Sequence, residues 1–326
     1  MKTKFAPVAA LLFCLIATSN VSATHIDSFY AFGDSLSDIG NNPSAVLSIY
    51  NLLGGNCDPL HPCPPYFDGR YSNGPVASEY LAEAILPGGG QPANYFSYAV
   101  AGSTTGIGNF GDGGTVFTPG FAGLPGMAQQ FGLYFSTTAV ADPNALYMVW
   151  GGANDFLTFD SPIVAAQNVA SYVSGLAAIN AAQILVPNIP DLSLTPFINV
   201  DNPALAGVAQ AFSLAFNFEL ASQLDVVRAL FPATNIIEYD IFSLFNDAVS
   251  NPSAYGFTNV THACLLVECS NPDEFLFWDD FHPTTRGHAF IASELAAAVP
   301  EPASLVLICL GLAGIGYQRR KQINKA

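Results

Sequence analysis

Two short segments at opposite ends of the chain carry residue types that could perform nucleophilic acyl transfer. Ser35 directly follows an apolar stretch at 28–32, and near the other end Asp279 stands three residues before His282. That spacing lets one short loop point the carboxylate at the imidazole, which fixes the tautomer of the ring and stabilises its cation. His282 could then accept the proton of Ser35 and return it to the leaving group. Asp280 is the alternative partner, but the three-residue spacing favours Asp279.

Two further segments offer hydrogen-bond donors for the anion that such a reaction creates. Gly102 follows a second apolar stretch, and Asn154 follows a third. A glycine N–H, an asparagine side-chain amide and the N–H of Ser35 itself are suitable donors to an oxyanion. We therefore expect Ser35, Gly102 and Asn154 to form an oxyanion hole beside the nucleophile.

These segments must be brought together by the elements next to them. Five apolar, β-rich stretches recur along the chain, at 28–32, 95–100, 145–150, 184–187 and 236–239. Helical patterns lie between and after them, at 76–86, 163–182, 204–230 and 285–299. Alternation of this kind predicts an α/β fold with a mainly parallel sheet that helices cover on both faces. Loops beyond the carboxyl ends of the strands form the active sites of such folds.

The blocks around these residues resemble, in content and order, those of the GDSL or SGNH hydrolase family, and the resemblance spans nearly all of 28–298. The four characteristic residues of the family and the aspartate partner carry over to Ser35, Gly102, Asn154, His282 and Asp279. The resemblance implies a three-layer α/β/α, flavodoxin-like fold with a five-stranded sheet. It also implies hydrolysis of esters through an acyl-enzyme, without a metal or cofactor.

Two extended blocks look most like one branch of that family. Residues 33–41 and 69–75 are similar to the corresponding blocks of the lipase and phospholipase or haemolysin branch. The block around Gly102 departs mildly from the family pattern. Ser97 stands where many members have asparagine, and Ser103 stands where alanine is usual.

Both ends of the chain have the composition of sorting signals. Residues 1–23 contain two lysines, an apolar stretch and small residues before a cleavage point, as a secretory signal peptide does. Residues 300–326 combine a Pro-Glu-Pro triplet, an apolar stretch at 303–317 and a basic cluster. This segment resembles the PEP-CTERM sorting signal of Gram-negative bacteria. The resemblance implies an exosortase-type partner, transit through the inner membrane, and delivery of a hydrolase domain at 24–299 to the cell surface or extracellular matrix. An ordinary membrane anchor is the alternative.

The charge of the chain excludes nucleic acid as a partner. The 326 residues carry a formal net charge of −16. Of the 25 Asp and Glu residues, 24 lie between 24 and 300, against three arginines and no lysine. A surface this negative cannot neutralise phosphates. With 51% hydrophobic residues, the chain is also unlike a disordered acidic polypeptide.

Four cysteines of the body form two close pairs, Cys57 with Cys63 and Cys264 with Cys269. In an exported protein these are disulfide candidates, and pairing between neighbours is the simplest of three connectivities. His61 lies inside the first pair. With no second Cys/His cluster nearby in the sequence, a metal site there is disfavoured, and His61 is expected to be structural or exposed.

Two segments interrupt the alternation of strands and helices. Residues 41–73 contain four prolines between Pro59 and Pro65 and are expected to form an irregular excursion. Residues 103–126 contain eight glycines in 24 positions and are expected to form a mobile loop over the sheet. The sequence leaves open whether that loop is a lid or has no role.

The residues together predict an exported serine esterase or lipase that acts on acyl esters of a lipid or an acylated sugar. A deacetylase of extracellular polysaccharide would use the same site, and transfer of the acyl group to an alcohol is a further possibility. A catalytically silent surface or matrix protein on the same scaffold is the alternative from another class. A pocket lined by Trp and Tyr would favour a sugar, whereas an apolar tunnel under 103–126 would favour a lipid.

Overall fold

A parallel sheet lies at the centre of the structure, a computed structural model that describes residues 25–300. Within that range the sheet has five strands in the order β2-β1-β3-β4-β5, and all neighbouring strands are parallel. They are β1 (Ser28–Gly33), β2 (Tyr95–Ser97), β3 (Ala145–Trp150), β4 (Gln183–Pro187) and β5 (Asn235–Tyr239). The predicted α/β class and five-stranded sheet are confirmed. The expected signal peptide at 1–23 and nearly all of the sorting segment at 300–326 lie outside the described residues.

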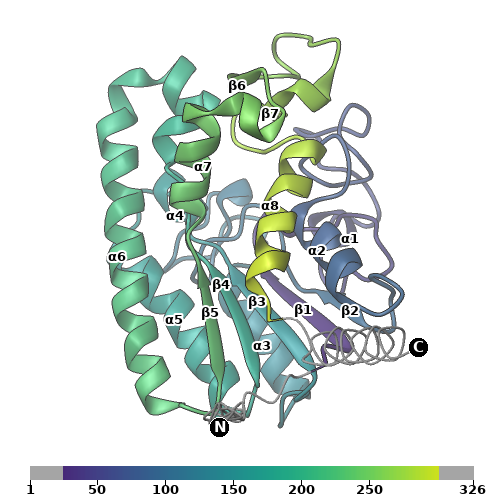
Figure 1. The fold of residues 1–326 in the computed structure, drawn as a ribbon, viewed down its shortest axis with the longest axis vertical. Helices are drawn as coiled ribbons and strands as arrows, with labels where there is room; N and C mark the ends of the chain where they lie inside the picture. Colours follow the sequence, from purple (N-terminus) through teal and green to yellow (C-terminus); the bar gives the residue numbers. More distant parts are fainter. Residues whose placement is uncertain (1–24, 301–326) are drawn as a thin grey trace, which may run out of the picture. The chain divides into compact units, whose positions relative to one another are not determined.

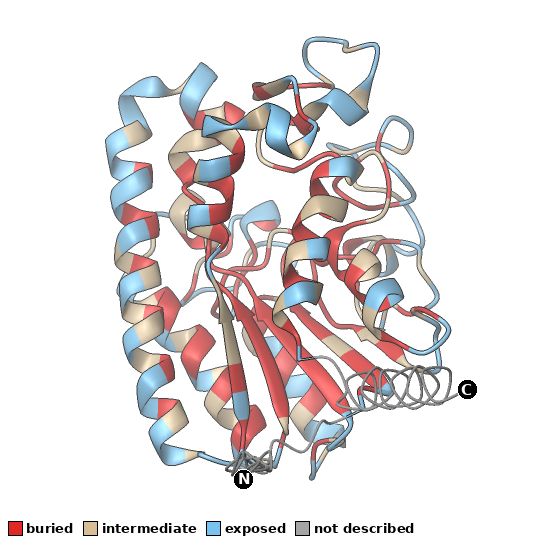
Figure 2. Cartoon of the chain, viewed as in Figure 1, coloured by how far each residue is buried: buried red, intermediate tan, exposed pale blue. Residues whose placement is uncertain are grey.

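Helices cover both faces of this sheet and complete three layers (Figure 1). They are α1 (Ile49–Leu52), α2 (Ala77–Ile85), α3 (Met127–Thr137), α4 (Ala153–Leu157), α5 (Pro162–Ala178), α6 (Ala206–Leu230), α7 (Ile241–Ser250) and α8 (Thr285–Ala298). Successive side chains of a strand point to opposite faces. Phe32 accordingly packs in one buried cluster with α3, α5 and α6, and Phe29 packs in another with α2, α7 and α8. Figure 2 shows buried strands at the centre and helices that are exposed on their outer sides.

Helices α3 and α7 were not predicted from the sequence. The buried residues of α7, Ile241, Leu244, Phe245 and Ala248, do have helical spacing. However, α7 begins directly after β5, and α3 begins directly after the glycine-rich segment, so neither helix has a clear boundary in the sequence. Packing against the sheet stabilises both helices despite their short length.

The strand order creates a crevice at the carboxyl ends of β1 and β3. From β1 the chain moves outward to β2, and it then returns to add β3 on the other side of β1. A reversal of this kind separates the loops that follow the two neighbouring strands. Open α/β sheets bind their ligands in the crevice between these loops. Ser35, Gly102 and Asn154 each follow one of the first three strands by a few residues, so the topology brings them to one edge of the sheet.

A small second sheet, which the sequence did not predict, supports the loop at 278–284. Strand β6 (Asn259–Ala263) pairs with β7 (Phe275–Phe277), and the Cys264 N–H donates to the last carbonyl of β7 at 3.0 Å. A disulfide between Cys264 and Cys269 closes the turn that follows β6. The loop before α8 is thereby joined to a covalently closed turn.

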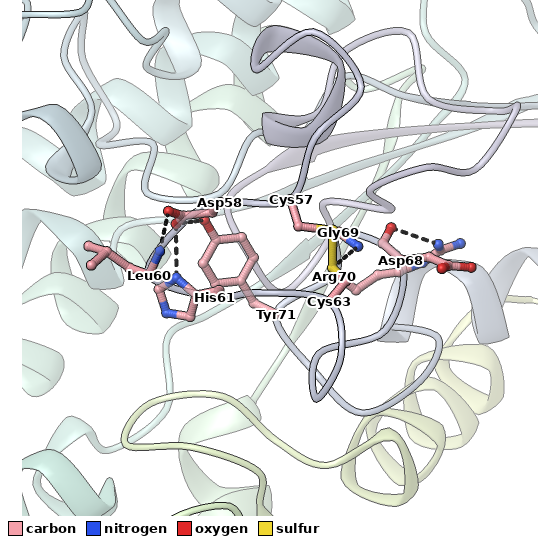
Figure 3. The surroundings of a disulfide bond; sticks show 9 residues. All are labelled: Cys57, Asp58, Leu60, His61, Cys63, Asp68, Gly69, Arg70 and Tyr71. Carbon is pink, nitrogen blue, oxygen red and sulfur yellow. Dashed lines mark hydrogen bonds and ion pairs between the residues drawn. A yellow bond between two sulfur atoms is a disulfide. The ribbon is translucent and has the colours of Figure 1, made fainter.

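The proline-rich segment at 41–73 packs against the same loop. Cys57 and Cys63 form a disulfide within it (Figure 3), so both pairs adopt the simplest connectivity. Tyr66 from this segment packs with Trp278 and with cysteines of both disulfides in one cluster. The two disulfide-closed loops therefore meet next to Asp279 and His282, the residues that follow Trp278.

Candidate active site

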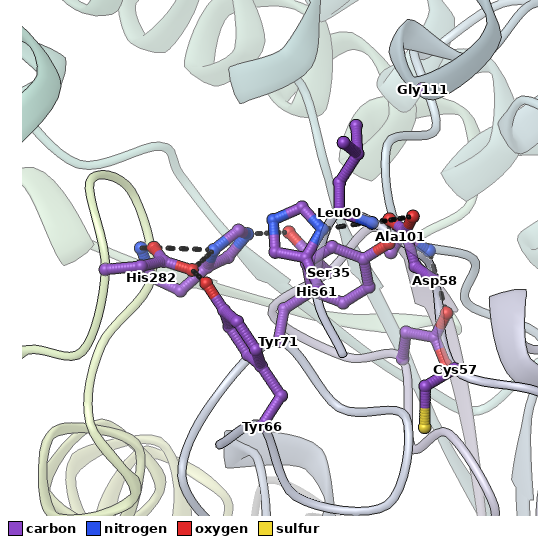
Figure 4. Close-up of polar contacts among 12 residues, drawn as sticks. Ser35, Cys57, Asp58, Leu60, His61, Tyr66, Tyr71, Ala101, Gly111 and His282 are labelled. Carbon is purple, nitrogen blue, oxygen red and sulfur yellow. Dashed lines mark hydrogen bonds and ion pairs between the residues drawn. The ribbon is translucent and has the colours of Figure 1, made fainter. Parts of the chain in front are cut away.

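Ser35, His282 and Asp279 form a continuous chain of hydrogen bonds. Figure 4 shows Ser35 beside the His282 ring. Ser35 Oγ lies 2.8 Å from His282 Nε2, and His282 Nδ1 lies 2.8 Å from each carboxylate oxygen of Asp279. The serine and the aspartate are each 7% exposed and the histidine is 9% exposed, so little water competes for these bonds. Because Asp279 accepts from Nδ1, Nε2 is the nitrogen that can take the proton of the hydroxyl. The arrangement can convert a serine into a nucleophile.

Asp279 is held by several donors besides the imidazole. The N–H groups of Phe281 and His282 donate to Oδ1 at 2.9 and 2.8 Å, and the Tyr66 hydroxyl donates to Oδ2 at 2.8 Å. Burial alone would raise the pKa of Asp279, but the charge and ring N–H of His282 and the backbone donors lower it to about 2. Asp279 therefore stays ionised. Nothing in the spacing of 41–73 marks Tyr66 as its partner, so the sequence analysis missed this residue.

A further carboxylate, Asp38, joins two of the strand-end loops. It accepts hydrogen bonds from the N–H of Ile49 at 2.9 Å and from the N–H of Ala101 at 2.8 Å. Burial raises the pKa of Asp38 to about 6, although its backbone donors oppose the shift. Because Ala101 precedes Gly102, this contact fixes the backbone just before Gly102 relative to the turn that follows β1. The sequence pattern around Asp38 does not predict this role.

Gly102 and Asn154 line the same pocket as Ser35. Gly102 has a φ of +78°, and an added Cβ would lie 2.3 Å from Oδ1 of Asn109, so a larger residue does not fit. In the described part of the chain, the N–H groups of Ser35 and Gly102 donate to no other protein group. Nδ2 of Asn154 donates to the Ser103 carbonyl at 3.0 Å, which leaves its second hydrogen available.

The glycine-rich segment at 103–126 forms one wall of this pocket. The Thr105 N–H and hydroxyl donate to the Asp155 carboxylate at 3.0 and 2.6 Å. Burial raises the pKa of Asp155 to about 7. Asp112 accepts a hydrogen bond from the N–H of Leu124 at 2.9 Å. This bond joins the end of the glycine-rich segment to its middle. Asp155 therefore braces the glycine-rich segment against the start of α4.

The pocket has a volume of about 480 Å³, within the usual range for small-molecule sites. Its lining is predominantly apolar and includes Phe110, Phe121, Leu124, Leu157, Leu192 and Ile198. Among the residues that the structure describes, Tyr71 is the one tyrosine in the lining, and no tryptophan belongs to it. By the criterion set from the sequence, this lining favours a lipid acyl chain over a sugar.

Three polar residues of the first disulfide region also face the pocket, and the sequence analysis assigned none of them to the site. They are Asp58, His61 and Tyr71. The His61 ring centroid lies 6.2 Å from that of His282, so His61 lies next to the hydrogen-bonded chain of Ser35, His282 and Asp279. The Asp-x-x-His spacing of Asp58 and His61 was the signal that could have revealed them. Within residues 25–300 no three His, Cys, Asp or Glu side chains are grouped as a metal site requires.

The fold and the site together define the class of the protein: a hydrolase of ester bonds with a serine nucleophile. A family model described as GDSL-like lipase/acylhydrolase matches residues 29–295, and the chain belongs to this family. A second model, the PEP-CTERM protein-sorting motif, matches residues 298–321. The motif indicates export and a C-terminal membrane-sorting signal, and it implies an exosortase-type partner.

Relatives of the chain include both plant and bacterial proteins. A GDSL esterase/lipase of Arabidopsis thaliana is 25% identical, over 83% of this chain and 88% of its own length. The thermolabile hemolysin of Vibrio parahaemolyticus is 26% identical over 83% of this chain, and the match covers 63% of the hemolysin. A solved structure of a lipolytic G-D-S-L family protein from Veillonella parvula matches 82% of this chain and 94% of its own, with a TM-score of 0.43 and 14% identity.

Proposed function

We propose that this exported protein hydrolyses acyl esters of lipids through an acyl-enzyme on Ser35. His282 acts as the general base and then as the general acid, and Asp279 orients the ring and stabilises its cation. The proposal rests mainly on the continuous 2.8 Å hydrogen bonds from Ser35 Oγ through His282 to the Asp279 carboxylate. Ser35 and His282 also line an apolar pocket.

The oxyanion of each tetrahedral intermediate is bound by three donors. These are the N–H groups of Ser35 and Gly102 and the free Nδ2 hydrogen of Asn154. The two N–H groups have no other acceptor among the described residues, which supports this role. Donors that are already in place cost no reorganisation when the negative charge develops.

The acyl group lies in the apolar pocket below the glycine-rich segment. Phe110, Phe121 and Leu124 come from this segment and line the pocket together with side chains from beyond β3 and β4. Burying apolar surface contributes about 25 cal/mol per Å², so a chain of several methylene groups binds more strongly than an acetyl group. The pocket therefore favours a lipase or esterase over a polysaccharide deacetylase.

The site of action is the cell surface or extracellular matrix of a Gram-negative bacterium. The PEP-CTERM motif at 298–321 supports this placement, with the inner membrane crossed in transit and an exosortase-type enzyme acting on the tail. Two disulfides in the body suit an oxidising compartment outside the cytoplasm.

Hydrolysis of p-nitrophenyl acetate, octanoate and palmitate by the purified exported protein tests the proposed substrate. We expect kcat/KM for octanoate to exceed that for acetate by at least about tenfold, because the longer chain fills the pocket. A preference for acetate would instead indicate a deacetylase. No turnover of any ester by a folded protein would indicate a surface or matrix protein without this activity.

A further inference from the structure

The pocket contains a second Asp-x-x-His pair that is built like the first (Figures 3 and 4). Asp58 accepts a hydrogen bond from His61 Nδ1 at 2.9 Å, from the N–H of Leu60 at 2.9 Å and from the hydroxyl of Tyr71 at 2.6 Å. Asp279 has the same three kinds of donor: an imidazole three residues later, an N–H two residues later and a tyrosine hydroxyl. The proposed mechanism uses only one of the two pairs.

This second pair fixes the orientation and the tautomer of His61. Burial alone would raise the pKa of Asp58, but the hydrogen bonds from His61 and Tyr71 lower it to about 2. An ionised carboxylate can only accept, so Nδ1 of His61 carries a hydrogen and Nε2 of the neutral ring carries a lone pair. Nε2 has no hydrogen-bond partner among the described residues. The Cys57–Cys63 disulfide closes the loop that carries the pair.

His61 lies close to the His282 ring, where the proposed mechanism requires the alcohol to depart. The Tyr71 ring centroid is 4.3 Å from that of His61 and 5.2 Å from that of His282. In the proposed mechanism His282 returns its proton to the oxygen of the leaving alcohol, so this alcohol must lie beside the His282 ring. Asp58, His61 and Tyr71 thus form a polar wall in a pocket that is otherwise mostly apolar.

We propose that Nε2 of His61 accepts a hydrogen bond from a hydroxyl group in the alcohol half of the ester. The site then selects acyl esters of polyols, such as glycerol or a sugar, over esters of simple alkyl alcohols. This inference rests on the proposed function. An anionic alcohol fits poorly, because within the described residues no lysine or arginine lines the pocket, whereas Asp34, Asp58, Asp112 and Asp191 do.

Hydrolysis of glyceryl monooctanoate and ethyl octanoate by the purified exported protein tests the inference. In His61→Phe the flat ring that packs against Tyr66 and Tyr71 is kept, but the acceptor is removed. We expect the ratio of kcat/KM for the glyceryl ester to that for the ethyl ester to fall about tenfold, mainly through KM, because one hydrogen bond to the substrate is lost. His61→Gln keeps an acceptor and should recover part of the ratio. Glucose 6-octanoate, measured in parallel, shows whether a sugar or glycerol is preferred.

The exposed His262 on β6 provides the matched control, and His262→Phe should leave the ratio unchanged. An unchanged ratio in His61→Phe would overturn the inference. An equal loss on both esters would also overturn it, since His61 would then only support the triad. If the wild-type protein hydrolysed neither ester, the proposed function itself would fail, and this outcome is distinct from failure of the inference alone.

Discussion

Ser35→Ala should reduce ester hydrolysis by at least about 10³-fold, because the variant lacks the oxygen that would form the acyl-enzyme. The hydroxyl is the group that lies 2.8 Å from His282 Nε2, and no other described side chain is hydrogen-bonded to that nitrogen. Initial rates on p-nitrophenyl octanoate measure the effect. Binding of the substrate should change little, so the loss should appear in kcat rather than in KM.

Ser37→Ala is the matched control for this experiment. Ser37 belongs to the same turn, but its buried hydroxyl has no hydrogen-bond partner among residues 25–300, so its removal should leave turnover near the wild-type rate. A Ser35→Ala protein that retained more than a few per cent of the activity would contradict the role of Ser35. Equal losses in both variants would indicate damage to the turn rather than loss of a nucleophile.

Asp279→Asn should lower kcat by about 10⁴-fold while leaving the fold intact. An asparagine does not enforce the tautomer with the hydrogen on Nδ1, and it does not stabilise the imidazolium. The wild-type rate should fall at acidic pH because protonated His282 cannot act as a base. Asp279 does not cause this fall, since its pKa of about 2 keeps it ionised throughout. Initial rates of both proteins on p-nitrophenyl octanoate at neutral pH measure the loss.

The neighbouring carboxylate gives the control for Asp279. Burial raises the pKa of Asp280, and one of its carboxylate oxygens is buried with no hydrogen-bond partner in the described part of the chain. Asp280→Asn should therefore stay within a few-fold of the wild-type rate. If Asp280→Asn lost the activity and Asp279→Asn kept it, the assignment of the acidic residue would be reversed.

The sequence was sufficient to predict the residues of the site that follow regular strands or precede a regular helix. Ser35, Gly102 and Asn154 come directly after strands with clear apolar patterns, and parallel strands place such loops at one edge of a sheet. His282 precedes a helix, and its partner Asp279 lies close in sequence. Local spacing and strand order together therefore determine where these residues meet.

The sequence was not sufficient to predict the contacts of residues that lie in irregular segments. Tyr66 reaches Asp279 across 213 positions of sequence, from a proline-rich segment without periodicity. The small β6–β7 sheet lies outside the alternation of strands and helices from which the central strands were predicted. The position of these parts depends on tertiary packing around the two disulfides, which local sequence does not encode.

The sequence around His61 contains a signal that predicts a second hydrogen-bonded imidazole. Asp58 and His61 repeat the spacing of Asp279 and His282 and lie next to a cysteine pair. Considered as a metal site, the pattern had no second cluster of ligands. Considered as a second hydrogen-bonded imidazole, it would have led to the polar wall of the pocket.

The most direct test of the account is covalent labelling of the purified exported protein with an alkyl fluorophosphonate, followed by peptide mass spectrometry. An activated serine attacks the phosphorus and displaces fluoride, which leaves a stable analogue of the acyl-enzyme. We expect one adduct, on the peptide that contains Ser35, with labelling strongly slowed in His282→Ala and absent in Ser35→Ala. An adduct on a different residue, or no adduct on a folded wild-type protein, would contradict the claim that Ser35 is the nucleophile of an ester hydrolase.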